Sequence, residues 1–166
     1  IVIKLNPEDY GYEILSESLK AEKEGMWAKQ GAYAAAWKNL IYVTAMKAAN
    51  AHSPGLKTGA AKHIYTYLRD NYKNVDVNPI GALISYLKRL EGVKLGKLEA
   101  SLKARELQRL YRLEDIAHLL EDLNNVCANC PVLVLIDELD SGWDGSEDAI
   151  AFVAGLFNAG TSISIM

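Results

Sequence analysis

The sequence predicts an α/β fold in which a parallel sheet carries a large helical insertion. Two short apolar segments, Ile1–Leu5 and Val132–Ile136, have the character of strands. The second is an unbroken apolar run, mostly β-branched, which is typical of a strand buried on both faces of a parallel sheet. Between the two lies a long stretch with apolar residues at helical spacing. Because parallel strands need such crossovers, this order of elements indicates an α/β fold.

The chain fits a single domain, which we divide into three parts. Its 166 residues fall in the range of roughly 100–200 residues for one domain. Residues 1–20 are expected to hold the first strand and a helix at Tyr12–Leu19. Residues 21–112 are expected to form the insertion, which is mainly helical. Residues 113–166 are expected to hold a helix, the second strand and the helix that follows it.

Within the insertion, apolar side chains recur at helical spacing in Ala32–Asn50 and in Ala60–Tyr72. Pro79 suits the first turn of a helix, which predicts a further helix at Pro79–Leu90. Val93–Leu102 alternates loosely, in keeping with a hairpin or an edge strand.

In the last part, Leu113–Val126 has apolar residues on one face of a helical period. Ser146 can cap the final helix, and two acids follow it in the first turn, where the helix dipole favours negative charge. We expect this helix to end at Asn158–Gly160. The residues expected on its buried face are Ala149, Ile150, Val153, Leu156 and Phe157.

Composition narrows the setting of the protein. Half of the residues are hydrophobic and the formal net charge is -3, with none of the basic blocks typical of nucleic-acid binding. No apolar run approaches the roughly 20 residues of a membrane-spanning helix, and we see no secretory signal. We therefore predict a cytoplasmic protein without a transmembrane segment. Since both ends lie in strand-like residues, we expect a piece of a longer protein.

Three other features of the sequence are better explained by packing or by a solvated surface than by a functional site. Cys127 and Cys130 have the spacing of redox and zinc motifs, but they precede a strand and no second pair accompanies them. Tryptophans and tyrosines, Trp37 among them, are spaced for helix packing rather than for stacking on bases. The mildly basic stretch at residues 94–112 is expected to be a solvated face.

The acids after the second strand form the candidate site. Asp137, Glu138 and Asp140 follow the apolar run, and ligands of open α/β sheets lie beyond the carboxyl ends of the strands. Phosphoryl transfer needs Mg²⁺ on the phosphate oxygens and a group that orients the attacking water. Asp137 suits the metal, directly or through a bound water, and Glu138 suits the water. The two need not compete for one place, because neighbouring strand residues point to opposite faces.

This stretch resembles the Walker B strand of P-loop ATPases in which the strand ends in Asp-Glu, the division that includes the AAA+, STAND and KAP-type ATPases. The longer segments LIDELDSGWD at 135–144 and EDAIAFVAGL at 147–156 are similar to an uncharacterised bacterial P-loop ATPase family. The resemblance is specific over these segments and loose before them.

The resemblance implies part of a P-loop NTPase sheet that binds ATP and Mg²⁺. By it, Asp137 corresponds to the metal-binding residue and Glu138 to the catalytic residue. Asp140, Trp143 and Asp144 correspond to the signature that follows the strand. Of these three, only Asp140 is assigned to nucleotide binding.

One part of the family pattern is absent from these residues. The phosphate-binding loop, G-x-x-x-x-G-K-S/T, is imitated at Gly92–Leu98 and at Gly55–Gly59. In the first stretch the spacing is one residue short and Leu98 stands where the pattern has Ser or Thr. In the second, Ala60 follows Gly59 where the pattern has Lys. We therefore expect the loop upstream of Ile1, and no ATP hydrolysis by these residues alone.

Two functions from different classes follow as hypotheses. The first is an ATPase in the full-length protein, in which the nucleotide drives a switch or a motor. The second is a non-catalytic α/β module that binds a protein or DNA partner. Self-association is compatible with either, and the sequence does not name the process that ATP would drive.

Overall fold

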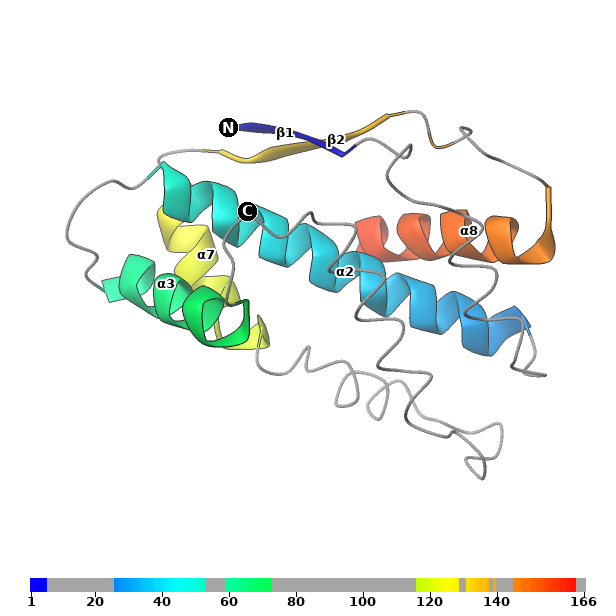
Figure 1. The fold of residues 1–166 in the computed structure, drawn as a ribbon, viewed down its shortest axis with the longest axis horizontal. Helices are drawn as coiled ribbons and strands as arrows, with labels where there is room; N and C mark the ends of the chain where they lie inside the picture. Colours follow the sequence, from blue (N-terminus) through cyan, green and yellow to red (C-terminus); the bar gives the residue numbers. More distant parts are fainter. Residues whose placement is uncertain are drawn as a thin grey trace, which may run out of the picture.

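The computed structural model describes residues 1–5, 26–52, 59–72, 116–128, 131–137, 139 and 145–163. Within these ranges a two-stranded parallel sheet lies over a layer of helices, so the part of the chain that the structure describes is broadly α/β (Figure 1). The helices expected at Tyr12–Leu19 and Pro79–Leu90, and the hairpin or edge strand expected at Val93–Leu102, fall outside the described residues.

The sheet pairs β1 (Val2–Leu5) with β2 (Leu133–Ile136) in parallel. In register, Val2 lies opposite Leu133 and Leu5 opposite Ile136. The ladder continues past both ends of β2, because Ile1 N donates to Pro131 O at 2.7 Å and Asp137 N donates to Leu5 O at 3.2 Å. Both predicted strands and their parallel orientation are therefore confirmed.

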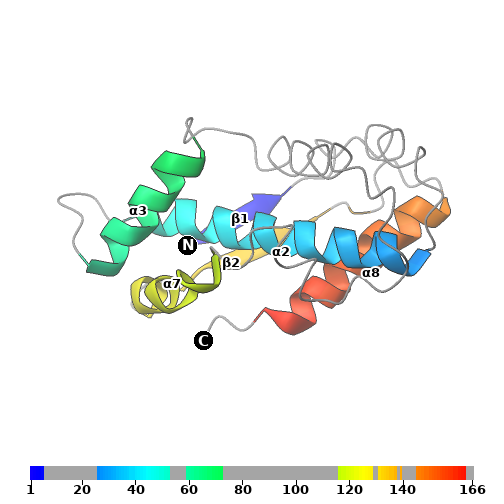
Figure 2. The same cartoon turned by 90° about the horizontal axis from the view of Figure 1, so that it is seen from below.

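The long helix α2 (Met26–Ala51) spans the helical layer and contacts most of the other elements. Figure 2 shows α8 (Glu147–Ser162) beside one half of α2, and α3 (Gly59–Asn71) and α7 (Leu120–Cys127) flanking the other half. The predicted helix at Ala60–Tyr72 is thus confirmed to within one residue at each end. The helix expected from Ala32 begins earlier, at Met26. For the helix expected at Leu113–Val126, residues 113–115 lie outside the described residues, Ile116 and Ala117 are helical, and α7 follows after a turn and ends at Cys127.

A first apolar cluster joins the sheet, α2 and α8. Trp37 and Phe152 lie at its centre with ring centroids 4.8 Å apart, and Trp37 Nε1 donates to the Phe152 carbonyl oxygen at 3.1 Å. The inner face of the sheet packs on this cluster through Ile3, Val134 and Ile136. Burial of these apolar side chains is the main favourable contribution to the packing of the sheet on the helices.

A second cluster joins the other half of α2 to α3 and α7. Met46, Ile64 and Leu123 are fully buried in it, and Val132, just before β2, packs against it. His63 Nδ1 and Asp122 Oδ2 lie 2.9 Å apart at its solvent-facing edge. An exposed pair of this kind contributes about 0–1 kcal/mol, so apolar burial dominates this cluster too.

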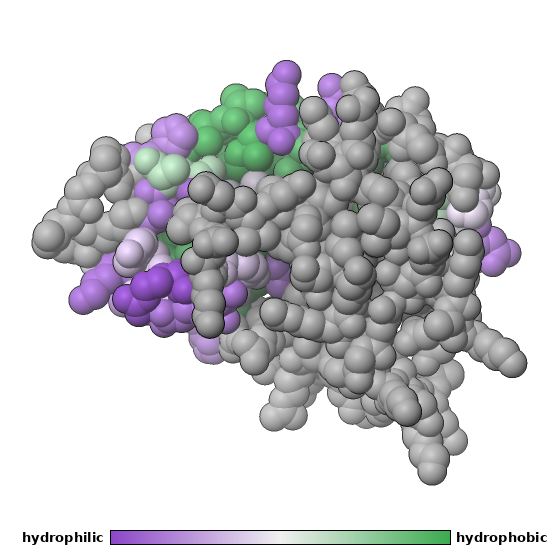
Figure 3. Space-filling view, viewed as in Figure 1, coloured by the Kyte–Doolittle hydropathy of each residue, from purple (hydrophilic) through white to green (hydrophobic). Residues whose placement is uncertain are grey.

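One expectation about burial is wrong and a second is wrong in part. Strand β2 is not buried on both faces: Leu133 is 54% exposed and Leu135 is 39% exposed, since the described helices cover only its inner face. Figure 3 shows apolar surface gathered over the strands. The expected buried face of α8 is partly correct, because Ala149 is buried and Val153 and Leu156 pack against the first cluster. Ile150 and Phe157, however, are exposed, whereas Phe152 and Ala159 are buried.

The orientation of α8 against α2 has a steric cause. A Cβ atom added to Gly155 would come within 2.5 Å of Tyr33 Cβ and 2.9 Å of the Ala34 nitrogen. The two helix backbones therefore approach closely at Gly155, and this contact sets which face of α8 meets α2. The helix also runs past the expected stop at Asn158–Gly160 and ends at Ser162.

Candidate functional site

The candidate site lies where β1 and β2 end. The carboxyl ends of the two strands share one edge of the sheet, because Leu5 and Ile136 are in register. Asp137 is the first residue after β2, and its backbone nitrogen is held by the Leu5 carbonyl oxygen. Asp137 is thus fixed at the carboxyl edge of a parallel pair, as the sequence predicts.

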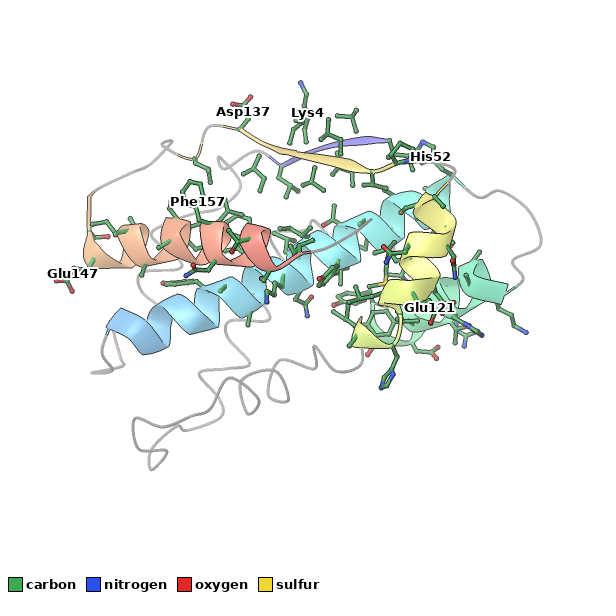
Figure 4. The ribbon with its side chains drawn as sticks, turned by 180° about the vertical axis from the view of Figure 1, so that it is seen from behind. Lys4, His52, Glu121, Asp137, Glu147 and Phe157 are labelled. Atoms are coloured by element: carbon green, nitrogen blue, oxygen red, sulfur yellow. The ribbon has the colours of Figure 1, made fainter. Side chains whose placement is uncertain are left out.

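The Asp137 side chain points to the outward side of the sheet. It is exposed, and Figure 4 shows it directed away from the helical layer together with Lys4 of β1. This follows from strand alternation, since Leu133, Leu135 and Asp137 share one face while Val134 and Ile136 share the other. A ligand of the Asp137 carboxylate would approach from solvent, beyond the end of the sheet.

Lys4 is the residue at this edge that the sequence pattern did not single out. It lies opposite Leu135 in the register, which is diagonal to Asp137 on the same face. An ammonium group there places a positive charge on the face that carries the carboxylate. The alternation along Val2–Leu5 could have assigned Lys4 to the outward face of its strand. Its nearness to Asp137, however, follows only from the pairing of the two strands.

The start of α8 follows the strand after a short connection. Gly145 has a φ of 70°, a conformation that glycine adopts without a steric penalty. Ser146 then caps the helix, because its Oγ accepts a hydrogen bond from the Ala149 nitrogen at 3.2 Å. The predicted cap is confirmed. Glu147 lies exposed at this helix start and is separate from Asp137 in Figure 4.

Of the residues predicted to act on the nucleotide, the structure describes Asp137. Glu138 and Asp140 lie outside the described residues, as do Trp143 and Asp144. Within the described ranges, no group of three or more His, Cys, Asp or Glu side chains could hold a metal ion. The described part of the site is therefore one carboxylate at the strand end.

The packing explanation holds for the other features that are described. Cys127 is buried at the end of α7, and Trp37 is fully buried. The Tyr33 ring packs edge-on against the Phe152 ring, with the ring centroids 5.4 Å apart. Burial raises the pKa of the Tyr42 hydroxyl above its ordinary value. Cys130 and the basic stretch at 94–112 lie outside the described residues.

Among the helices that the structure describes, none is long and apolar enough to cross a membrane. Comparison of the chain with models of protein families, with curated proteins and with solved structures finds no match.

Proposed function

We propose that this chain is the Walker B part of an ATP-binding and ATP-hydrolysing P-loop domain. One observation carries the proposal: Asp137 directly follows a strand of a parallel pair, at the edge of the sheet where the strands end. In open α/β sheets this edge is the place where ligands bind. The acidic sequence that continues through Glu138 and Asp140 supplies the chemistry.

Each acid has a separate role in the proposed site. Asp137 binds Mg²⁺, directly or through a metal-bound water, and the metal neutralises charge on the phosphate oxygens. Glu138 accepts a proton from the attacking water or orients it toward the γ-phosphate. Asp140 contacts the bound nucleotide. Exposure of Asp137 supports this assignment, because a buried carboxylate would be closed to an incoming ligand.

The path of the chain through α8 supports an α/β domain built from strand–helix units. Ile163 leaves α8 with an extended backbone, at φ -86° and ψ 113°. It packs on the same cluster as Val132, which precedes β2. Helix α8 therefore returns the chain toward the amino end of β2, as a helix does between parallel strands.

In this proposal the helical part of the chain responds to the nucleotide. Helix α7 ends at Cys127, close in sequence to the start of β2 at Leu133, and both α7 and α3 pack on α2. A displacement of the carboxyl end of β2 on ATP binding would be passed through the strand to α7 and α3. This coupling is the basis for a nucleotide-driven switch or motor.

Binding of the nucleotide is the first test. In the proposed domain the phosphate-binding loop lies outside these 166 residues. We therefore expect micromolar MgATP binding by the protein that carries this chain with its upstream residues, and none by the 166 residues alone. Isothermal titration calorimetry of both, with and without Mg²⁺, measures this. Micromolar binding by the 166 residues alone, or none by the longer protein, would overturn the proposal.

The second candidate is a non-catalytic interaction module for a protein or DNA partner. The observation that favours it is the exposed apolar face of the sheet, at Val2, Leu133 and Leu135, since apolar patches on a surface often mark interaction sites. Absence of MgATP binding by the longer protein would favour this candidate.

A further inference from the structure

We draw no further inference here: the strongest candidate, the outward face of the two-stranded sheet at Val2, Leu133 and Leu135, is an unpartnered apolar surface, and nothing in the described parts of the chain shows what covers it.

Discussion

At the scale of single residues, the backbone of Asp137 is held by strand pairing. Its nitrogen donates to the Leu5 carbonyl oxygen, which extends the ladder one residue beyond β2. A change confined to the side chain should therefore leave the strand in place. This separates the proposed metal role of Asp137 from any role in folding.

Replacement of Asp137 by asparagine removes the charge while keeping the size of the side chain. In the full-length protein we expect the Mg²⁺ concentration for half-maximal ATP turnover to rise at least about 10-fold, because loss of even an outer-shell partner of a metal site costs about 10- to 100-fold in affinity. Glu121→Gln is the matched control, because Glu121 is exposed on α7, away from the strand end (Figure 4). An unchanged Mg²⁺ dependence in Asp137→Asn would rule out the metal role.

Two phenylalanines of α8 offer a matched pair for testing the first apolar cluster. Phe152 is 1% exposed between Tyr33 and Trp37, whereas Phe157 is 67% exposed. Phe152→Ala should destabilise the protein by about 3–5 kcal/mol, because it removes buried surface and leaves a cavity. Phe157→Ala should change stability by about 0.5 kcal/mol or less.

Urea denaturation followed by circular dichroism measures both variants. Equal losses of stability, or a larger loss for Phe157→Ala, would mean that α8 turns a different face to α2.

At the scale of elements, the contact between α2 and α8 depends on a glycine. Gly155 lies against the backbone of Tyr33 and Ala34, so any side chain there must push the helices apart. Gly160 belongs to the same helix and has no heavy atom within 4 Å of the position a Cβ would take. The two glycines therefore differ in packing although both belong to α8, Gly155 in the middle of the helix and Gly160 in its last turn.

The substitution Gly155→Ala should destabilise the protein by about 1–3 kcal/mol through overpacking. Gly160→Ala should instead be neutral or stabilise by up to about 1 kcal/mol, because alanine has the higher helix propensity. Thermal denaturation of the two variants beside the parent gives the comparison. A stabilising Gly155→Ala would show that the helices are not in close contact at this point.

The sequence predicted some elements well for identifiable reasons. Helix α3 has a strong apolar stripe, on which Ile64 and Leu68 are buried, and its predicted limits agree with the structure. The Ser146 cap was predictable because a short polar side chain before two acids satisfies free N–H groups locally. Such signals lie within a few residues of one another.

The buried face of α8 could not be predicted in this way. Residues 149–157 are apolar on almost every side of the helix, so no single periodicity selects a face. The close approach at Gly155 decides the matter, and it depends on Tyr33, a distant residue in the chain. Likewise, exposure of Leu133 and Leu135 depends on which helices cover the sheet, which a run of apolar residues does not specify.

At the scale of the whole molecule, α2 connects two apolar clusters with different neighbours. One supports the sheet and α8, and the other joins α3 and α7. The chain segment that leads to Asp137 contacts both clusters, through Ile136 of β2 in the first and through Val132, just before β2, in the second. The candidate site is therefore attached to both halves of the described structure.

Prediction of the site from the sequence reached the strand, its parallel partner and the place of Asp137 at its end. It did not find Lys4, since the register between β1 and β2 joins residues that lie 131 positions apart in the chain, such as Lys4 and Leu135. Register is set by pairing in the folded state and not by either strand alone. The roles of Glu138 and Asp140 remain predictions from the sequence.

The most direct test of the central claim is ATP turnover by the full-length protein with Glu138 replaced by glutamine. Glu147→Gln is the control, because Glu147 is an exposed acid at the start of α8. Loss of the water-activating carboxylate should lower turnover by about 10²- to 10⁴-fold while MgATP still binds, and the control should match the parent. Equal turnover by Glu138→Gln and the parent would contradict the assignment of this strand as Walker B.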